Sequence, residues 1–267
     1  MDDVVLYDKA GGIATITLNR PDRMNAWTGE LSDALQAYRG EADRDDEVVV
    51  VVITGAGKAF CAGADLGDGE GGFLPVTAED DGRPRLWPYQ VRKPIIAAIN
   101  GHAVGVGITI AMLCDIRIVA EDAKVQYAMV RRGVVPELAS HVILPRVVGF
   151  SRAAELMLTG RMMSGAEAAE LGLASKAVPA AEVLAEATSL AAEMVRNASP
   201  VALGVSKQLL WQGVTSSVDV MLNREGRVIS SIARMPDAVE GVTAFFERRD
   251  AVWSGSVNDS ADDILQR

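Results

Sequence analysis

The sequence contains few of the residues that would indicate a metal site or a nucleic-acid partner. Its two histidines, His102 and His141, and its two cysteines, Cys61 and Cys114, show no spacing typical of a zinc site, so we expect no bound metal. Acidic residues outnumber basic ones, and the net charge is -10. A negative charge of this size disfavours binding to nucleic acid and to anionic membrane surfaces.

Long apolar runs are also missing. The longest, 94–120, is interrupted by Asn100, His102, Asp115 and Arg117, which a membrane span would not contain. The first residues, MDDVVLYDKA, are acidic, unlike a secretory or transit peptide. Each cysteine lies in an apolar stretch, which favours buried free thiols in a reducing compartment over a disulfide. We therefore expect a cytoplasmic protein with no membrane partner.

The sequence does contain alternating strand and helix patterns. The stretch VVLYDKAGGIATITLNRP predicts a hairpin around Gly11 and Gly12, and a helix with Thr28 as its cap follows. The β-branched run EVVVVVITGAG is typical of a strand buried on both faces. PIIAAINGHAVG predicts another strand, a glycine turn and a helix. Because this order repeats, we predict an α/β fold.

The C-terminal third is dominated by helical patterns. Ser151 and Ser164 are predicted helix caps, Ser164 with Glu167 fits a capping box, and Ser199-Pro200 predicts a further helix start. We therefore predict an α/β core at 1–199 and a helical C-terminal region at 200–267. The segment 67–90 is rich in Gly, Pro and Asp, and its length suggests a functional loop.

Two glycine-rich turns share one design. ITGAGKAFCAGADL and INGHAVGVGITIAM each end a strand and continue into small residues, which would let a ligand approach the main chain and its free N–H groups. The alternative is that the glycines only permit tight packing of strand on helix. A dinucleotide site is disfavoured because the second turn lacks a third glycine at the required spacing. A Walker loop is excluded because no Gly-Lys-Ser/Thr follows.

Several motifs, in order, resemble the enoyl-CoA hydratase/isomerase (crotonase) family. They are NRPDRMNAW, GKAFCAGADL, NGHAVGVGITIAMLCDIRIV, RRGVVPELASHVILPRVVG and TGRMMSGAEAAELGL, and the resemblance covers nearly the whole chain. It implies a crotonase-like spiral of ββα units with a helical C-terminal region that packs against neighbours in a homotrimer or dimer of trimers. It also implies an acyl-CoA thioester substrate, with coenzyme A as part of that substrate and no separate cofactor.

The resemblance also implies roles for individual residues. The main-chain N–H groups of Ala64 and Val106 would hold the thioester oxygen as it becomes an enolate, with Gly105 forming the turn. Positions expected to bind the substrate or its CoA moiety are Ala62, Asp65 and Leu66 in the first turn, Arg23, Met24 and Ala26 in the RPDRMNA turn, and also Gly105 and Pro136. Arg248 and Arg249 are further candidates for the CoA phosphates, against the alternative of ordinary solvated arginines.

The acids of the site depart from the hydratase pattern. The two positions where the resemblance places glutamates hold Thr109 and Met129. Glu137, after Pro136, matches the single catalytic glutamate of the family's enoyl-CoA isomerases. The alternative for Glu137 is an acid favoured by the dipole of a helix start.

We therefore predict an isomerase, with a hydratase of fatty-acid β-oxidation and a noncatalytic acyl-CoA binder as alternatives. Asp68 or Glu70 could supply a second carboxylate for hydration. Other polar residues are expected to be structural. Asp115 would hold a turn, His102 would brace the glycine turn through a main-chain hydrogen bond, His141 would be a bystander, and Cys61 would pack in the core.

Overall fold

The computed structural model describes residues 3–67 and 85–259. Within these ranges the larger sheet has the strand order β1-β2-β3-β5-β7-β10, in which β1 and β2 are antiparallel and all other neighbours are parallel. Its strands are β1 (Val5–Ala10), β2 (Ile13–Leu18), β3 (Val50–Gly55), β5 (Ile95–Ile99), β7 (Ile116–Ala120) and β10 (Lys176–Val178). The first two form the hairpin predicted around Gly11 and Gly12.

A smaller sheet has the order β4-β6-β8-β9. Its strands are β4 (Ala59–Cys61), β6 (His102–Val104), β8 (Lys124–Gln126) and β9 (Met162–Ser164), and only the β8–β9 pair is antiparallel. The chain passes from the larger sheet to the smaller one three times, from β3 to β4, from β5 to β6, and from β7 to β8. Helix α2 (Val106–Met112) follows the second passage. This alternation confirms the predicted spiral of ββα units.

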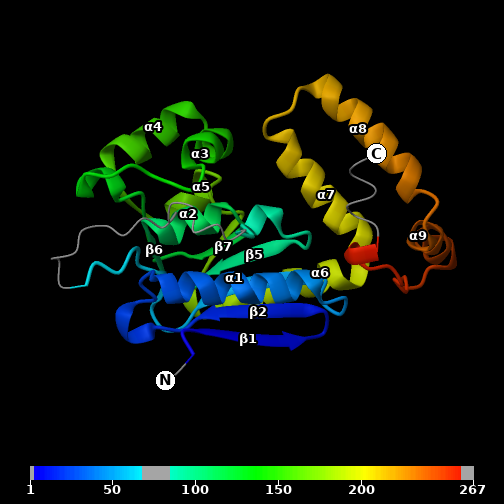
Figure 1. The fold of residues 1–267 in the computed structure, drawn as a ribbon, viewed down its shortest axis with the longest axis horizontal. Helices are drawn as coiled ribbons and strands as arrows, with labels where there is room; N and C mark the ends of the chain where they lie inside the picture. Colours follow the sequence, from blue (N-terminus) through cyan, green and yellow to red (C-terminus); the bar gives the residue numbers. More distant parts are fainter. Residues whose placement is uncertain (1–2, 68–84, 260–267) are drawn as a thin grey trace.

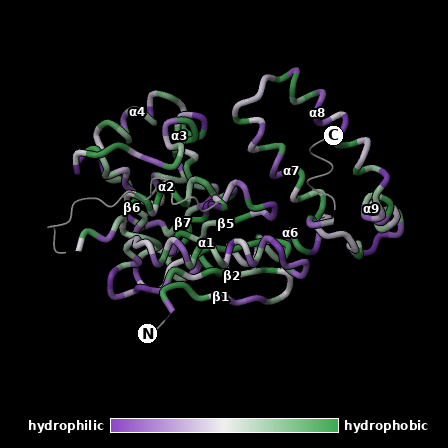
Figure 2. Tube along the Cα trace, in the orientation of Figure 1, coloured by the Kyte–Doolittle hydropathy of each residue, from purple (hydrophilic) through white to green (hydrophobic). Residues whose placement is uncertain are grey.

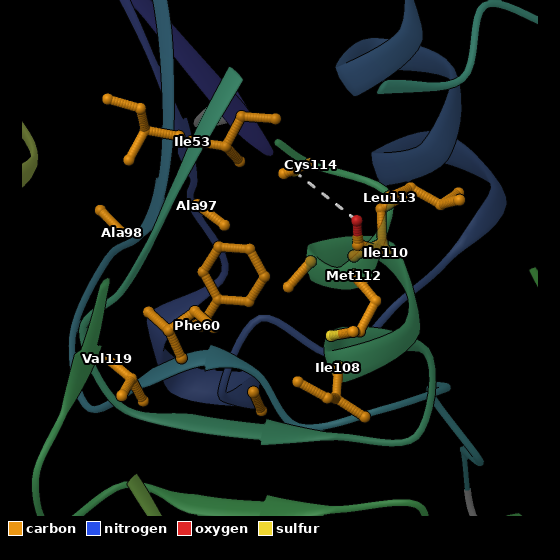
Figure 3. Close-up of a cluster of buried hydrophobic side chains, with 14 of the residues drawn as sticks. Ile53, Phe60, Ala97, Ala98, Ile108, Ile110, Met112, Leu113, Cys114 and Val119 are labelled. Atoms are coloured by element: carbon orange, nitrogen blue, oxygen red, sulfur yellow. Dashed lines mark hydrogen bonds between the residues drawn. The ribbon is translucent and has the colours of Figure 1, made fainter. Parts of the chain in front are cut away.

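The main core lies between these layers. All residues of β3 and β5 are buried, as the continuous apolar runs predict. Figure 2 shows the central strands in the green of hydrophobic residues. In Figure 3, Phe60 of β4 lies between Ala97 of β5 and Ile108 of α2, so the two sheets and α2 share one apolar interior. Helix α6 (Val183–Asn197) packs against β2, β3, β5 and β7, and α1 (Gly29–Arg44) packs against the hairpin.

The last helices extend away from the sheets (Figure 1). They are α7 (Pro200–Gly213), α8 (Val218–Ile232) and α9 (Pro236–Glu247), and a separate apolar cluster forms around Val201, Val205, Val228 and Val257. The buried amine of Lys207 on α7 lies 2.9 Å from a carboxylate oxygen of Asp115, and Trp211 Nε1 donates to the other oxygen at 2.7 Å. Asp115 therefore joins α7 to the core.

The predicted structural role of Asp115 is confirmed, since it also accepts a hydrogen bond from the Ile95 amide at 2.6 Å. Thr28 caps α1, Ser164 caps α5 (Gly165–Glu170) by accepting from the Glu167 amide, and Ser199 caps α7. The prediction for Ser151 is wrong. Helix α4 (Phe150–Thr159) begins at Phe150 with Gly149 as its N-cap, because Gly149, with a φ of 81°, ends α3 (Ser140–Val148) and starts the next helix.

Short 3-10 turns complete the described chain: η1 (Pro21–Arg23), η2 (Pro88–Gln90), η3 (Met129–Arg132), η4 (Ala180–Glu182) and η5 (Val257–Asp259). No helix within 3–67 and 85–259 combines the length and apolar character needed to cross a bilayer.

Candidate active site

The two glycine turns lie side by side at one edge of the smaller sheet. They follow β4 and β6, which are parallel neighbours, and the ends of parallel neighbours meet at the same edge. Gly107 makes one of the closest approaches, because a Cβ atom there would lie only 2.1 Å from the carbonyl oxygen of Cys61. Gly63 has a φ of +107° and faces the Val104 carbonyl. The packing interpretation of the glycines is therefore correct, and this packing brings the two turns together.

The main-chain N–H of Ala64 points away from the adjacent segment at Trp27. The Trp27 amide donates to the Gly63 carbonyl at 2.8 Å, and the Asp65 amide donates to the Trp27 carbonyl at 2.9 Å. Because successive N–H groups of an extended chain alternate in direction, the N–H of Ala64 lies on the opposite side from Trp27. It donates to no other residue in the described part of the chain.

The Val106 amide is the first of α2, so it has no acceptor inside that helix. The carbonyl of Gly105, the preceding residue, accepts hydrogen bonds from Ile108 and Thr109. Gly105 itself has a φ of +57° and donates its N–H to Gln126 at 3.0 Å. Within residues 3–67 and 85–259, the Val106 N–H is left without an acceptor.

A largely apolar pocket lies in front of these turns. Six of the residues predicted for the site line it: Ala62, Ala64, Leu66, Gly105, Val106 and Glu137. Other lining residues include Met129, at one of the two hydratase glutamate positions, and Arg132, which the sequence analysis did not single out. The sequence around Arg132 gives only a weak signal for a place at the site, namely a pair of arginines before Gly133. The pocket thus combines two unpaired amides with a single described carboxylate.

An unusual backbone turn presents Glu137 to the pocket. The next two residues, Leu138 and Ala139, both have left-handed conformations with φ of 53° and 57°. Such backbone conformations are uncommon for residues other than glycine. The amide and hydroxyl of Ser140 both donate to the Glu137 carbonyl, which fixes the turn just before α3. Glu137 is therefore in the turn that precedes the helix, not in its first turn.

The Glu137 carboxyl is half-buried. Burial raises its pKa, and a hydrogen bond from the Thr109 hydroxyl opposes that rise. Thr109 Oγ1 lies 2.8 Å from Glu137 Oε1 and has no exposed surface. A base that must accept a proton near neutral pH benefits from a raised pKa. Sequence reasoning named Thr109 only as the residue at a position where the resemblance places a glutamate, and it missed this contact.

Charged residues join the first turn to the N-terminal part of the chain. Asp65 accepts from Arg20 at 2.9 Å and from Arg23 at 3.2 Å, and the Arg20 hydrogen bond is the main reason for the lowered pKa of Asp65. Asn25 is fully buried and donates to the carbonyls of Ala56 and Ala59. Sequence reasoning missed Arg20 and Asn25, although an asparagine in a tight turn is a signal for such bonding.

The remaining predicted positions do not line this pocket. Met24 is exposed and its carbonyl accepts from the Ala62 amide, and Ala26 is half-buried beside it. Pro136 is buried and lines a separate apolar pocket that also contacts His141. Arg248 and Arg249 follow α9, far from β6 and α2 in Figure 1, and Arg249 pairs with Glu240 and Glu247. Asp68 and Glu70 lie outside the described residues.

The expected bystanders are structural. Cys61 and Cys114 are buried free thiols, and burial raises the pKa of Cys61 to about 12, so it is not a nucleophile. His102 Nδ1 accepts from the Lys124 amide at 3.2 Å, a main-chain bond that joins β6 to β8.

Comparison with known proteins finds relatives of one family. Residues 8–256 match the enoyl-CoA hydratase/isomerase family. The chain is 37% identical over 263 residues to enoyl-CoA hydratase ACTT3 of Alternaria alternata, covering 97% of this chain and 88% of that protein. Hydratase names are commoner than isomerase names among such relatives.

Solved structures agree in fold. The crystal structure of a probable enoyl-CoA hydratase/isomerase from Mycobacterium abscessus has a TM-score of 0.88 and 37% identity, covering 94% of this chain and 99% of that one. A monofunctional enoyl-CoA isomerase from M. smegmatis has a TM-score of 0.70 and 35% identity, covering 82% and 98%. The predicted crotonase-like fold class is confirmed.

Proposed function

This chain belongs to the enoyl-CoA hydratase/isomerase family, and on that premise we propose that it isomerises the double bond of an enoyl-CoA thioester. The observation that carries the proposal is the composition of the pocket. Glu137 is its one carboxylate among the described residues, and the two positions expected to hold hydratase glutamates are Thr109 and Met129. One carboxylate is sufficient for a proton shuttle between two carbons.

The proposed reaction uses the two unpaired amides and Glu137. The thioester oxygen accepts hydrogen bonds from the N–H groups of Ala64 and Val106. Glu137 takes the proton from C2, and the electron pair of the C–H bond moves into the thioester to form an enolate. The protonated Glu137 then returns the proton to C4, and the double bond shifts from C3=C4 to C2=C3. One preplaced donor to such an oxyanion is typically worth about 3–4 kcal/mol.

We propose that coenzyme A, as part of the substrate and not as a separate cofactor, lies along the two turns joined by Asp65. Ala62, Asp65 and Leu66 would contact it on one side, and Arg23, Met24 and Ala26 on the other. The exposure of 58% of the Arg23 side chain supports a phosphate contact, since one guanidinium can serve both Asp65 and a phosphate.

The decisive test is the Glu137→Gln variant. It should lose isomerisation of a 3-enoyl-CoA and also exchange of the C2 hydrogen with deuterated water, while still binding a CoA thioester. The isosteric amide keeps the shape but cannot accept a proton. If Glu137→Gln isomerises at the wild-type rate, the base lies elsewhere and the proposal is wrong.

The relatives' names favour a second candidate, hydration of a 2-enoyl-CoA. Hydration needs a group that activates water and a source of the second proton, and the pocket offers one described carboxylate. Crotonyl-CoA separates the candidates, because ordinary turnover to the 3-hydroxy product would establish the hydratase. A noncatalytic acyl-CoA binder would bind the thioester without any C2 exchange.

We further propose assembly into a homotrimer or a dimer of trimers in the cytoplasm. Exposed apolar side chains on α8 and α9 support a subunit interface, among them Leu222, Ile229, Phe245 and Phe246. The free thiols of Cys61 and Cys114 support a reducing compartment. Light scattering on the purified protein would test the assembly, and a monomeric mass would refute it. Fractionation of the source cells would test the compartment.

A further inference from the structure

Thr109, at a position where a hydratase glutamate was expected, contacts the carboxyl group of Glu137. Thr109 Oγ1 lies 2.8 Å from Glu137 Oε1 and 3.2 Å from the carbonyl oxygen of Val106. The hydroxyl is fully buried and has a single proton, so it donates to one of these two acceptors at a time, and the shorter distance and the negative charge favour Glu137. Its place is fixed by α2, the helix whose first amide belongs to Val106. The geometry therefore joins the carboxylate and the proposed oxyanion donor through one side chain.

We propose that Thr109 is a positioning residue that reserves Glu137 Oε1 as the hydrogen-bonded oxygen and leaves Oε2 to carry the proton between C2 and C4. This inference rests on the proposed isomerase function. A threonine hydroxyl has one proton to donate, and Oε1 can accept it both as part of the carboxylate and as the carbonyl oxygen of the acid. The bond therefore persists in both states of the shuttle, and no rearrangement accompanies each proton transfer.

The bond also opposes two unwanted outcomes. A proton on Oε1 would require the Thr109 hydroxyl to turn its own proton to the weaker acceptor, the Val106 carbonyl at 3.2 Å, so the proton taken from C2 stays on Oε2 and faces the substrate. Without the bond the carboxyl group could rotate about its last torsion, which is broad for glutamate, and lose that proton to water. The Thr109 hydrogen bond also stabilises the ionised form against the effect of burial on the Glu137 pKa.

The test compares Thr109→Val, which keeps the shape but removes the hydroxyl, with Thr109→Ser, which keeps the hydroxyl. With 3-enoyl-CoA as substrate, Thr109→Val should lower kcat about 10- to 100-fold with little change in KM, whereas Thr109→Ser should retain most activity. Glu137 must be ionised to act as the base, so activity falls as the pH falls through its pKa. Losing the donor raises this pKa, and the acid limb of the kcat/KM profile should move to higher pH.

Isomerisation in deuterated water supplies a readout that a purely structural role would not change. Thr109→Val should increase the share of C4 hydrogen derived from solvent, because the carboxyl is free to rotate and exchange. If Thr109→Val keeps the wild-type acid limb and solvent share, or if Thr109→Ser is as impaired as Thr109→Val, the inference is wrong. Failure of the proposed function gives a different result, namely no isomerisation by the wild type or full activity of Glu137→Gln.

Discussion

Replacing Gly107 by alanine would test whether close packing of the two turns creates the site. The added Cβ would lie 2.1 Å from the Cys61 carbonyl oxygen and 3.0 Å from the Cys61 Cβ. Real Cβ atoms do not approach other atoms within 3.0 Å, so the turns must separate by about 1 Å. Cys61 is three residues before Ala64, and Gly107 directly follows Val106, so the separation acts on both amides.

The expected effects differ for stability and activity. Overpacking a well-packed core typically costs about 1–3 kcal/mol, and we expect a loss in this range for Gly107→Ala. The two amides must contact one oxygen atom, and a displacement on the order of 1 Å at a catalytic site can lower the rate about 100-fold. The variant should therefore fold, unfold at a lower temperature than the wild type, and lose most of its activity.

Exchange of the C2 hydrogen of an acyl-CoA is the appropriate assay, since it needs only the oxyanion donors and the base. It should be measured well below the unfolding temperature of the variant, with thermal unfolding recorded in parallel. Gly29→Ala is the matched control, because nothing lies within 4 Å of a Cβ there and the residue is exposed. Wild-type exchange and stability in Gly107→Ala would refute the link between turn packing and the site.

Three further predictions concern charges and thiols. Asp65→Asn should lower stability by no more than about 1 kcal/mol at neutral pH. The pKa of Asp65 is lowered in the folded state. The stability difference between wild type and variant should therefore persist at pH values above the ordinary aspartate pKa and vanish as the pH falls through the lower pKa of the folded state. A pH-independent stability difference in urea unfolding would contradict this. Lys207→Met should cost about 3–5 kcal/mol in urea unfolding, because the largely enclosed Asp115 carboxylate loses its cation and the carbonyls of Pro88 and Lys93 lose their donor. A neutral effect would contradict the anchoring role of the pair. Ellman's reagent should label neither Cys61 nor Cys114 in the native protein and both in denaturant, and rapid native labelling would show that the buried positions are wrong.

Sequence patterns predicted the parts of the fold that local physics dictates. The buried strands β3 and β5 are continuous apolar runs, and the caps Thr28, Ser164 and Ser199 precede helices with the expected residue types. Ser151 failed as a cap because Gly149 supplies the turn two residues earlier. Local preference identified the right region but not the residue at which the helix begins.

The site was less predictable because its contacts join distant segments. Thr109 and Glu137 are 28 positions apart, and Arg20 and Asp65 are 45 apart, so no local pattern shows either pair. The left-handed turn at Leu138 and Ala139 carries no glycine to signal it. Motif matching placed Ala62, Ala64, Val106 and Glu137 on one pocket, but it did not indicate what holds the Glu137 side chain.

In the glycine turns, tight packing of strand on helix and access to free main-chain N–H groups are successive steps of one cause. A glycine at 107 lets α2 begin against the Cys61 carbonyl, and that approach places the Val106 amide on the same pocket as the Ala64 amide. The donors of the proposed oxyanion site are backbone atoms, so side chains around them can change without removing them. The identity of the acids can then vary on a constant backbone frame. In this chain one of the two positions where the resemblance places a hydratase glutamate holds Thr109, which hydrogen-bonds Glu137. The proposed choice of isomerisation over hydration therefore rests on the acids of the pocket and not on the fold.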